Sequence, residues 1–112
     1  MCTNRRADAI AQAVAACAKD MLGDRLECVV LYGSYARGDF DDESDVDLMV
    51  RVRCDKEELT SLHGAFIKIA SELSLKYGVE VSVSLTDTAT FNRYKHALPY
   101  YENVEREGVR IA

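Results

Sequence analysis

The sequence predicts an α+β domain in which helices pack mainly on one face of a β-sheet. Apolar residues recur every three or four positions in two long segments, 5–22 and 55–77, as they do on the buried face of a helix. The segments 26–32, 45–53 and 79–85 are rich in β-forming residues, and the last two alternate apolar and polar side chains. This order of helices and strands, followed by a helical tail, is typical of an α+β sheet.

The first strand is predicted to lead directly into a glycine-containing turn. The run 26–32 is compact and apolar, which indicates a buried strand, and Gly33 ends it. Residues 34–38 then form a short turn or a single helical turn, and the acidic segment 39–44 forms a surface loop. In the following strand, 45–53, the apolar face is expected to join the core and the other face to look toward a cleft or solvent.

Capping residues and turns mark the elements of the second half. Asp55 is expected to cap the long helix, and Asp87 or Thr88 a short one near the end of the third strand. Pro99 suits the first position of a further helix. Residues 109–111 are then expected to add an edge strand.

Length, composition and charge limit what this chain can be. The 112 residues are enough for one compact domain, residues 1–112, and too few for two. A hydrophobic fraction of 48% is that of a globular chain, and no apolar run is long enough to cross a bilayer. The net charge of −5 argues against a protein that coats or polymerises nucleic acid, which needs a basic surface. We therefore expect neither a membrane nor a nucleic-acid polymer as partner.

The cysteines are scattered without the paired spacing of a disulfide framework or a zinc site. They are Cys2, Cys17, Cys28 and Cys54. Buried, reduced thiols are the favoured interpretation. Reduced thiols in turn favour the cytoplasm.

The most informative pattern combines a glycine–serine turn with two aspartates on the next strand. Gly33 and Ser34 follow an apolar strand, and Asp45 and Asp47 open the next one. Because alternate residues of a strand share a face, the two carboxylates must point the same way, about 7 Å apart. Two like charges so placed call for a counter-ion, and Mg²⁺, which prefers oxygen ligands, is the simplest.

The turn has the features of a phosphate-binding site. A glycine at the end of a strand, followed by serine and a helical turn, aims backbone N–H groups at an anion with no side chain in the way. Gly33 allows close approach, and the Ser34 hydroxyl can donate to a phosphate oxygen. Arg37 contacts either the phosphate or nearby carboxylates, with the second role slightly favoured. The candidate carboxylates are those of Asp41, Asp42 and Asp45.

Two segments together resemble the signature of the minimal nucleotidyltransferases, within the DNA polymerase beta-like superfamily. They are 33–38 (Gly-Ser-Tyr-Ala-Arg-Gly) and 44–48 (Ser-Asp-Val-Asp-Leu). The resemblance covers nearly the whole chain and implies that fold, a mixed sheet whose turn faces the carboxylate strand. It also implies Mg²⁺-dependent transfer of a nucleoside monophosphate from a nucleoside triphosphate. Carried over, the nucleotide would be held by Gly33, Ser34, Arg37 and Ser44, and two Mg²⁺ ions by Asp45 and Asp47.

A third carboxylate is the part of the family pattern that fits less well. Active members often carry it on the later strand, as a metal ligand or base. Glu80 is the only candidate on the polar face of strand 79–85, and an exposed edge glutamate is an equal interpretation. If Ser82 or Ser84 takes that position instead, deprotonation of the acceptor is weakened, and nucleotide binding could persist without catalysis.

Two functions follow from the resemblance. The first is an enzyme that transfers AMP from ATP to a hydroxyl. Small stand-alone members often act as antitoxins beside a helical HEPN-type ribonuclease toxin and adenylylate a tyrosine on it, which implies such a partner. The alternative is a non-catalytic, nucleotide-binding antitoxin that neutralises its partner by covering it. Both are compatible with a homo- or hetero-oligomer.

Two further groups of side chains have open roles. Arg51 and Arg53 share a strand face with the aspartates, so they either line the cleft or are simply exposed. The tail carries an aromatic cluster, Tyr94, Tyr100 and Tyr101, which is either a contact surface for another protein or packing for a C-terminal helix.

Overall fold

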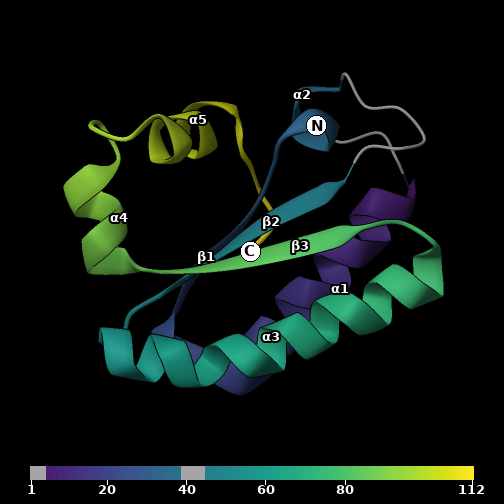
Figure 1. Ribbon diagram of the computed structural model, residues 1–112, viewed down its shortest axis with the longest axis horizontal. Coiled ribbons are helices and arrows are strands. Elements are labelled where there is room, and N and C mark those ends of the chain that lie inside the picture. Colours follow the sequence, from purple (N-terminus) through teal and green to yellow (C-terminus); the bar gives the residue numbers. More distant parts are fainter. Residues whose placement is uncertain (1–4, 39–44) are drawn as a thin grey trace.

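The computed structural model describes residues 5–38 and 45–112 as a four-stranded sheet with helices on both faces (Figure 1). The predicted acidic loop, 39–44, lies outside the described residues. In chain order the elements are α1 (Arg5–Leu22), the 3₁₀ helix η1 (Gly23–Arg25), β1 (Leu26–Tyr32), α2 (Ser34–Arg37), β2 (Val46–Val52), α3 (Lys56–Tyr77), β3 (Val81–Asp87), α4 (Thr88–Tyr94), α5 (Pro99–Glu107) and β4 (Val109–Arg110).

The sheet is mixed, with strand order β3-β2-β1-β4. β1 runs antiparallel to both β2 and β4, whereas β2 and β3 are parallel. Parallel neighbours need a long crossover, and α3 supplies it between β2 and β3. The short strand β4 lies at one edge, as the tail of the sequence predicts, and β3 lies at the other.

The main core lies between the sheet and the two long helices, α1 and α3, which both cover the same face (Figure 1). The predicted apolar face of β2 is fully buried there, and consists of Val46, Leu48, Val50 and Val52. α1 contributes four alanines together with Ile10, Val14 and Leu22, and α3 contributes Phe66, which has no exposed surface. The predicted α+β class is therefore confirmed, and the two long helices share one face as expected, with shorter helices on the other.

A smaller core on the opposite face holds α4 and α5 against the sheet (Figure 1). Phe91 of α4 and Val104 of α5 pack there with Met49, Cys28 and Val30. These helices cover the middle of the face.

Most predicted boundaries are confirmed, and β3 is the exception. Asp55 caps α3 by accepting a hydrogen bond from the Glu58 N–H at 2.8 Å, and Pro99 opens α5. β3 begins at Val81, two residues later than the alternating pattern predicts. Its length is set by pairing with β2, since Val81 lies opposite Val46. A pattern within one strand cannot show where its neighbour starts.

No helix among the described residues is both long and apolar enough to cross a membrane. The cysteines in this part of the chain, Cys17, Cys28 and Cys54, are free thiols.

Asp87 ends β3 and caps α4, and this cap should contribute measurably to stability. Its carboxylate accepts a hydrogen bond from the Thr90 N–H at 2.9 Å. Replacing Asp87 with alanine leaves that donor without its partner, so we expect the free energy of unfolding at pH 7 to fall by about 1 kcal/mol. Asp87→Asn retains a capping oxygen and serves as the control. Urea denaturation of the three proteins measures the difference.

The same cap has a predictable pH dependence. Burial alone would raise the pKa of Asp87, but the hydrogen bonds from Thr90 outweigh burial and lower the pKa below its usual 3.8. The stabilisation is therefore complete above the unfolded-state pKa and is lost as the pH falls through the lower folded-state pKa. Wild type and Asp87→Ala should converge in stability in strong acid, and a constant difference at every pH would contradict this account.

Candidate active site

The turn after β1 has a backbone that only glycine adopts readily. Gly33 has φ 77° and ψ −154°, a region that side-chain-bearing residues avoid. The chain then makes one helical turn, α2, closed by hydrogen bonds from the Arg37 N–H to the Gly33 carbonyl at 3.1 Å and from the Gly38 N–H to the Ser34 carbonyl at 2.9 Å. The predicted strand, glycine and helical turn are all present.

Gly33 and Asp47 are in close contact. A Cβ atom added at Gly33 would lie 2.6 Å from Oδ2 of Asp47, too close for any real side chain. The contact follows from the antiparallel register, in which Tyr32 lies opposite Asp47, so that the next residue bends over the carboxylate. The structure thus brings together the glycine of the turn and one of the two aspartates.

Asp47 carries a carboxylate whose charge is poorly accommodated. It is half-buried on β2, and burial raises its pKa. The negative charge of Asp45 raises it further, whereas the Arg37 guanidinium lowers it. Asp45 itself is exposed and directly precedes the strand. A pair of carboxylates in mutual repulsion, one of them half-buried, is stabilised by a bound cation.

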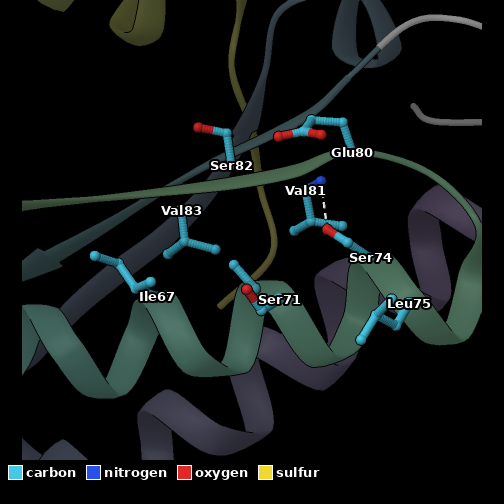
Figure 2. A pocket seen from close by; sticks show the side chains of 9 residues that line it. Ile67, Ser71, Ser74, Leu75, Glu80, Val81, Ser82 and Val83 are labelled. Carbon is cyan, nitrogen blue, oxygen red and sulfur yellow. Dashed lines mark hydrogen bonds between the residues drawn. The ribbon is translucent and has the colours of Figure 1, made fainter.

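Ser82, and not Glu80, lies beside Asp47. In the parallel pairing of β2 with β3, Asp47 is opposite Ser82. Glu80 precedes β3, is exposed, and has its side chain on the same side of the strand as Ser82, away from α3 (Figure 2). Among the described residues no three His, Cys, Asp or Glu side chains form a metal-binding group, so Glu80 is not gathered with the two aspartates.

Arg37 is held by a residue that the sequence does not suggest. Its Nη1 lies 3.2 Å from Oε2 of Glu107, at the end of α5. Of the partners considered from the sequence, Asp41 and Asp42 lie outside the described residues. The Arg37–Glu107 pair spans 70 positions, so no local pattern could have revealed it. The pair places a positive charge beside the turn and fixes its direction.

A pair of tyrosines, Tyr32 and Tyr100, lies next to the turn. The sequence did not predict that these two residues belong to the candidate site. The Tyr32 and Tyr100 hydroxyls are 3.1 Å apart, and the rings meet edge to face at 5.7 Å. Burial raises the pKa of Tyr32, and its hydrogen bond with Tyr100 raises it further. Tyr101 packs edge to face on Phe91. Tyr100 and Tyr101 therefore dock α5 on the sheet. In the sequence, the position of Tyr32 directly before Gly33 could have indicated that this tyrosine lies near the candidate site.

The remaining predicted residues lie at different distances from this arrangement. Ser34 opens α2, next to Gly33, and is partly exposed. Ser44 lies outside the described residues. The Arg51 guanidinium stacks 3.5 Å above the Phe91 ring. Arg53 follows β2, where it donates to the Asp24 carbonyl at 2.7 Å. Neither arginine joins the aspartates.

The residues present fit a magnesium-bound triphosphate. Carboxylate oxygens are the ligands that Mg²⁺ prefers, and Asp45 and Asp47 supply them from neighbouring positions. The bend at Gly33 carries no side chain and lies against Asp47, so it forms a cradle that a Cβ would fill. Backbone N–H groups at the start of a helical turn suit phosphate oxygens. The candidate metal ligand Asp47 and the candidate phosphate-binding turn at Gly33 thus lie side by side.

A mixed sheet on which a glycine–serine turn meets an aspartate-bearing strand defines a class of nucleotide-transferring enzymes. Residues 14–111 match the family described as the nucleotidyltransferase domain. The chain belongs to this family and is a nucleotidyltransferase.

Two relatives come from Methanocaldococcus jannaschii, and each bears the name "Putative protein adenylyltransferase". One is 39% identical over 95 residues, which span 81% of this chain and 84% of the relative. The other is 33% identical over 84 residues, which span 75% of this chain and 76% of the relative. A crystal structure of a toxin–antitoxin with AMP-PNP is similar over 87% of this chain and 68% of its own, with 19% identity and a TM-score of 0.49.

The contact at Gly33 predicts a specific loss on substitution. Gly33→Ala brings a methyl group against Asp47 and imposes a disfavoured backbone, so we expect stability to fall by about 2 kcal/mol and Mg-ATP affinity by about tenfold or more. Gly78→Ala is the matched control, because Gly78 also has positive φ (66°) but open space around it. The control should lose about 1 kcal/mol and keep its affinity. Urea denaturation and calorimetric titration measure the two quantities.

Proposed function

We propose that this protein transfers AMP from ATP, with Mg²⁺, to a hydroxyl of a partner protein, and that it acts as an antitoxin on a tyrosine of a HEPN-type toxin. The contact between Gly33 and Asp47 carries the nucleotide part of the proposal, because it joins a phosphate cradle to a metal ligand. Relatives named as protein adenylyltransferases support AMP and a protein acceptor. The toxin is what the signature's resemblance to the minimal nucleotidyltransferases implies. Free thiols at Cys17, Cys28 and Cys54 support a cytoplasmic site of action.

The turn would hold the triphosphate. The backbone at Gly33 and the Ser34 hydroxyl donate hydrogen bonds to phosphate oxygens, and no side chain at position 33 blocks their approach. Arg37, held by Glu107, adds positive charge on the same side as Asp47. Ser44, which directly precedes Asp45 in the sequence, would be a further nucleotide contact.

Asp45 and Asp47 would hold the magnesium. When bound, Mg²⁺ neutralises phosphate charge and acts as a Lewis acid at the phosphoryl group. Asp47 would keep its ionised form best in the presence of the ion, because its burial and the repulsion from Asp45 would then be offset.

Glu80 is our candidate for the general base. The acceptor hydroxyl oxygen attacks the α-phosphorus, the bond from that phosphorus to the bridging oxygen breaks, and pyrophosphate leaves. The hydroxyl proton passes to the Glu80 carboxylate, which is exposed and lies on the same side of β3 as Ser82 (Figure 2). A tyrosine hydroxyl is more acidic than an aliphatic one, so it demands less of such a base.

One observation favours a second candidate function. Ser82 occupies the position beside Asp47, and serine is no base at neutral pH. If Glu80 does not reach the acceptor, the protein would bind Mg-ATP and neutralise its partner by covering it, without transfer.

Mass measurement of the partner separates the two functions. The chain, a candidate HEPN-type partner, Mg²⁺ and ATP are mixed, and the mass of the partner is measured. We expect a gain of one or more AMP masses, lost in Asp47→Asn because the variant has one fewer metal-binding charge. Asp20→Asn, an exposed change on α1, is the control and should behave as wild type. Neutralisation that persists in Asp47→Asn without any mass change would establish the non-catalytic function.

The role of Glu80 predicts a change in rate without a change in binding. Glu80→Gln keeps the size and hydrogen-bonding capacity but cannot accept a proton, so the transfer rate should fall by about 100-fold or more. Mg-ATP affinity should stay within about twofold, because no nucleotide contact is assigned to Glu80. Glu57→Gln on α3 is the matched exposed control. An unchanged rate in Glu80→Gln would remove the general base from the proposal.

A further inference from the structure

A cavity of about 220 Å³ lies between the sheet and the end of α5. The candidate active site does not use it. The sheet contributes Cys28 and Val30 from β1, Arg51 from β2 and Arg110 from β4. Val104 and Glu105 of α5 line the other side. Two arginines, an apolar floor and a buried thiol are thus gathered in one place.

Strand pairing brings the two arginines to this cavity from either side of β1. Arg51 lies opposite Cys28, and Arg110 lies opposite Val30. Cys28 and Val30 are alternate residues of β1 and therefore share a face, and the side chains paired with them share it too. Two guanidinium groups, here called the cavity arginines, consequently reach one space from opposite directions.

Arg51 carries a buried donor that has no acceptor. Its Nε is buried and makes no hydrogen bond. The guanidinium stacks 3.5 Å above the Phe91 ring, which attracts the charge but offers no acceptor to N–H groups in the guanidinium plane. Among the residues that the structure describes, no carboxylate pairs with Arg51. A buried donor without a partner is costly, so this side chain is suited to a ligand that supplies the acceptor.

Arg110 is held in position by neutral groups. Its Nε donates to the Ala112 carbonyl at 3.0 Å, and its Nη2 donates to the Glu27 carbonyl at 3.3 Å. Carbonyl oxygens orient the guanidinium without neutralising its charge. In residues 5–38 and 45–112 no acceptor binds Nη1 of Arg110, and no carboxylate pairs with it. The second cavity arginine is therefore placed and still available.

The absence of ion pairs at the cavity arginines contrasts with the rest of the chain. Elsewhere, arginines pair with glutamates, as is found for Arg25, Arg37, Arg53 and Arg106. Glu27, although close to Arg110 along the backbone, directs its carboxylate to Arg53. The two positive charges of the cavity are thus left without this kind of compensation.

The other titratable groups at the cavity do not balance its charge. Burial raises the pKa of Cys28, and the cavity arginines lower it only in part, so the thiol is neutral at neutral pH. Glu105 lines the cavity but is exposed and pairs with neither arginine. Two cations, one exposed carboxylate and a neutral thiol leave the cavity with a net positive charge.

We propose that this cavity binds inorganic phosphate between Arg51 and Arg110. Guanidinium N–H groups match phosphate oxygens in charge and geometry, and a dianion with four oxygens can serve both arginines at once. The cavity holds one phosphate with a few waters, and it is smaller than the spaces of about 300 Å³ or more that take larger organic ligands. Arg51 lies four residues beyond Asp47 on β2, about 13 Å away, so the site is separate from the proposed nucleotide site and does not rest on its function.

Calorimetric titration of the whole chain with inorganic phosphate tests this site. The titration is done without Mg²⁺, at constant ionic strength and mildly alkaline pH. Arg51→Met keeps an apolar cover on Phe91 but removes the donor and the charge, so the Kd should rise by about tenfold or more. Arg93→Met is the matched control, because Arg93 is exposed and stacks over Tyr94 outside the cavity. It should leave the Kd unchanged.

Two exposed variants keep the test independent of any folding defect in Arg51→Met. Arg110→Gln should raise the Kd several-fold, because one of the two positive charges is lost. Glu105→Gln should lower the Kd, because a negative charge beside the bound anion is removed. Opposite shifts from β4 and from α5 would locate the phosphate between them, and thermal denaturation checks that each variant is folded.

Three results would overturn the proposal. The first is no measurable binding at about 10 mM phosphate. The second is a Kd that none of the cavity variants changes, which would place the anion elsewhere, for example at the Gly33 turn. The third is equally tight binding of acetate, which would mean that the cavity selects a carboxylate. Mg-ATP affinity, measured in parallel, should stay within about twofold in Arg51→Met, since the two sites are separate.

Discussion

The close approach of Gly33 to the Asp47 carboxylate is the constraint on which the rest of the site depends. Antiparallel pairing places Tyr32 opposite Asp47, so the chain must turn away from β1 directly over the carboxylate. Only a residue without a side chain can make that turn, because a Cβ would lie 2.6 Å from Oδ2. The turn and the Asp47 carboxylate are thereby held against each other.

The tail of the chain supports this constraint from a distance. α5 docks on the sheet through the Tyr32–Tyr100 contact, and its last residue, Glu107, pairs with Arg37. Arg37 in turn lowers the pKa of Asp47, against the effects of burial and of Asp45. The C-terminal helix thus influences the charge balance at Asp47 through its ion pair with Arg37.

The sequence predicts those parts of the site and fold that are encoded locally. The glycine turn after β1 and the Asp55 cap of α3 both follow from short patterns. The partner of Arg37 does not, because Glu107 is distant along the chain. The start of β3 was also predicted wrongly, since it depends on its register with β2 and not on its own alternation.

That register also decides what β3 contributes to the chemistry. Parallel pairing sets Ser82 beside Asp47, and Glu80 lies two residues, about 7 Å, further back along the strand direction. A glutamate side chain is long enough to cover much of that distance, but only if the start of β3 is held firmly. Val81, bound to Ser74 of α3, already fixes one side of that start.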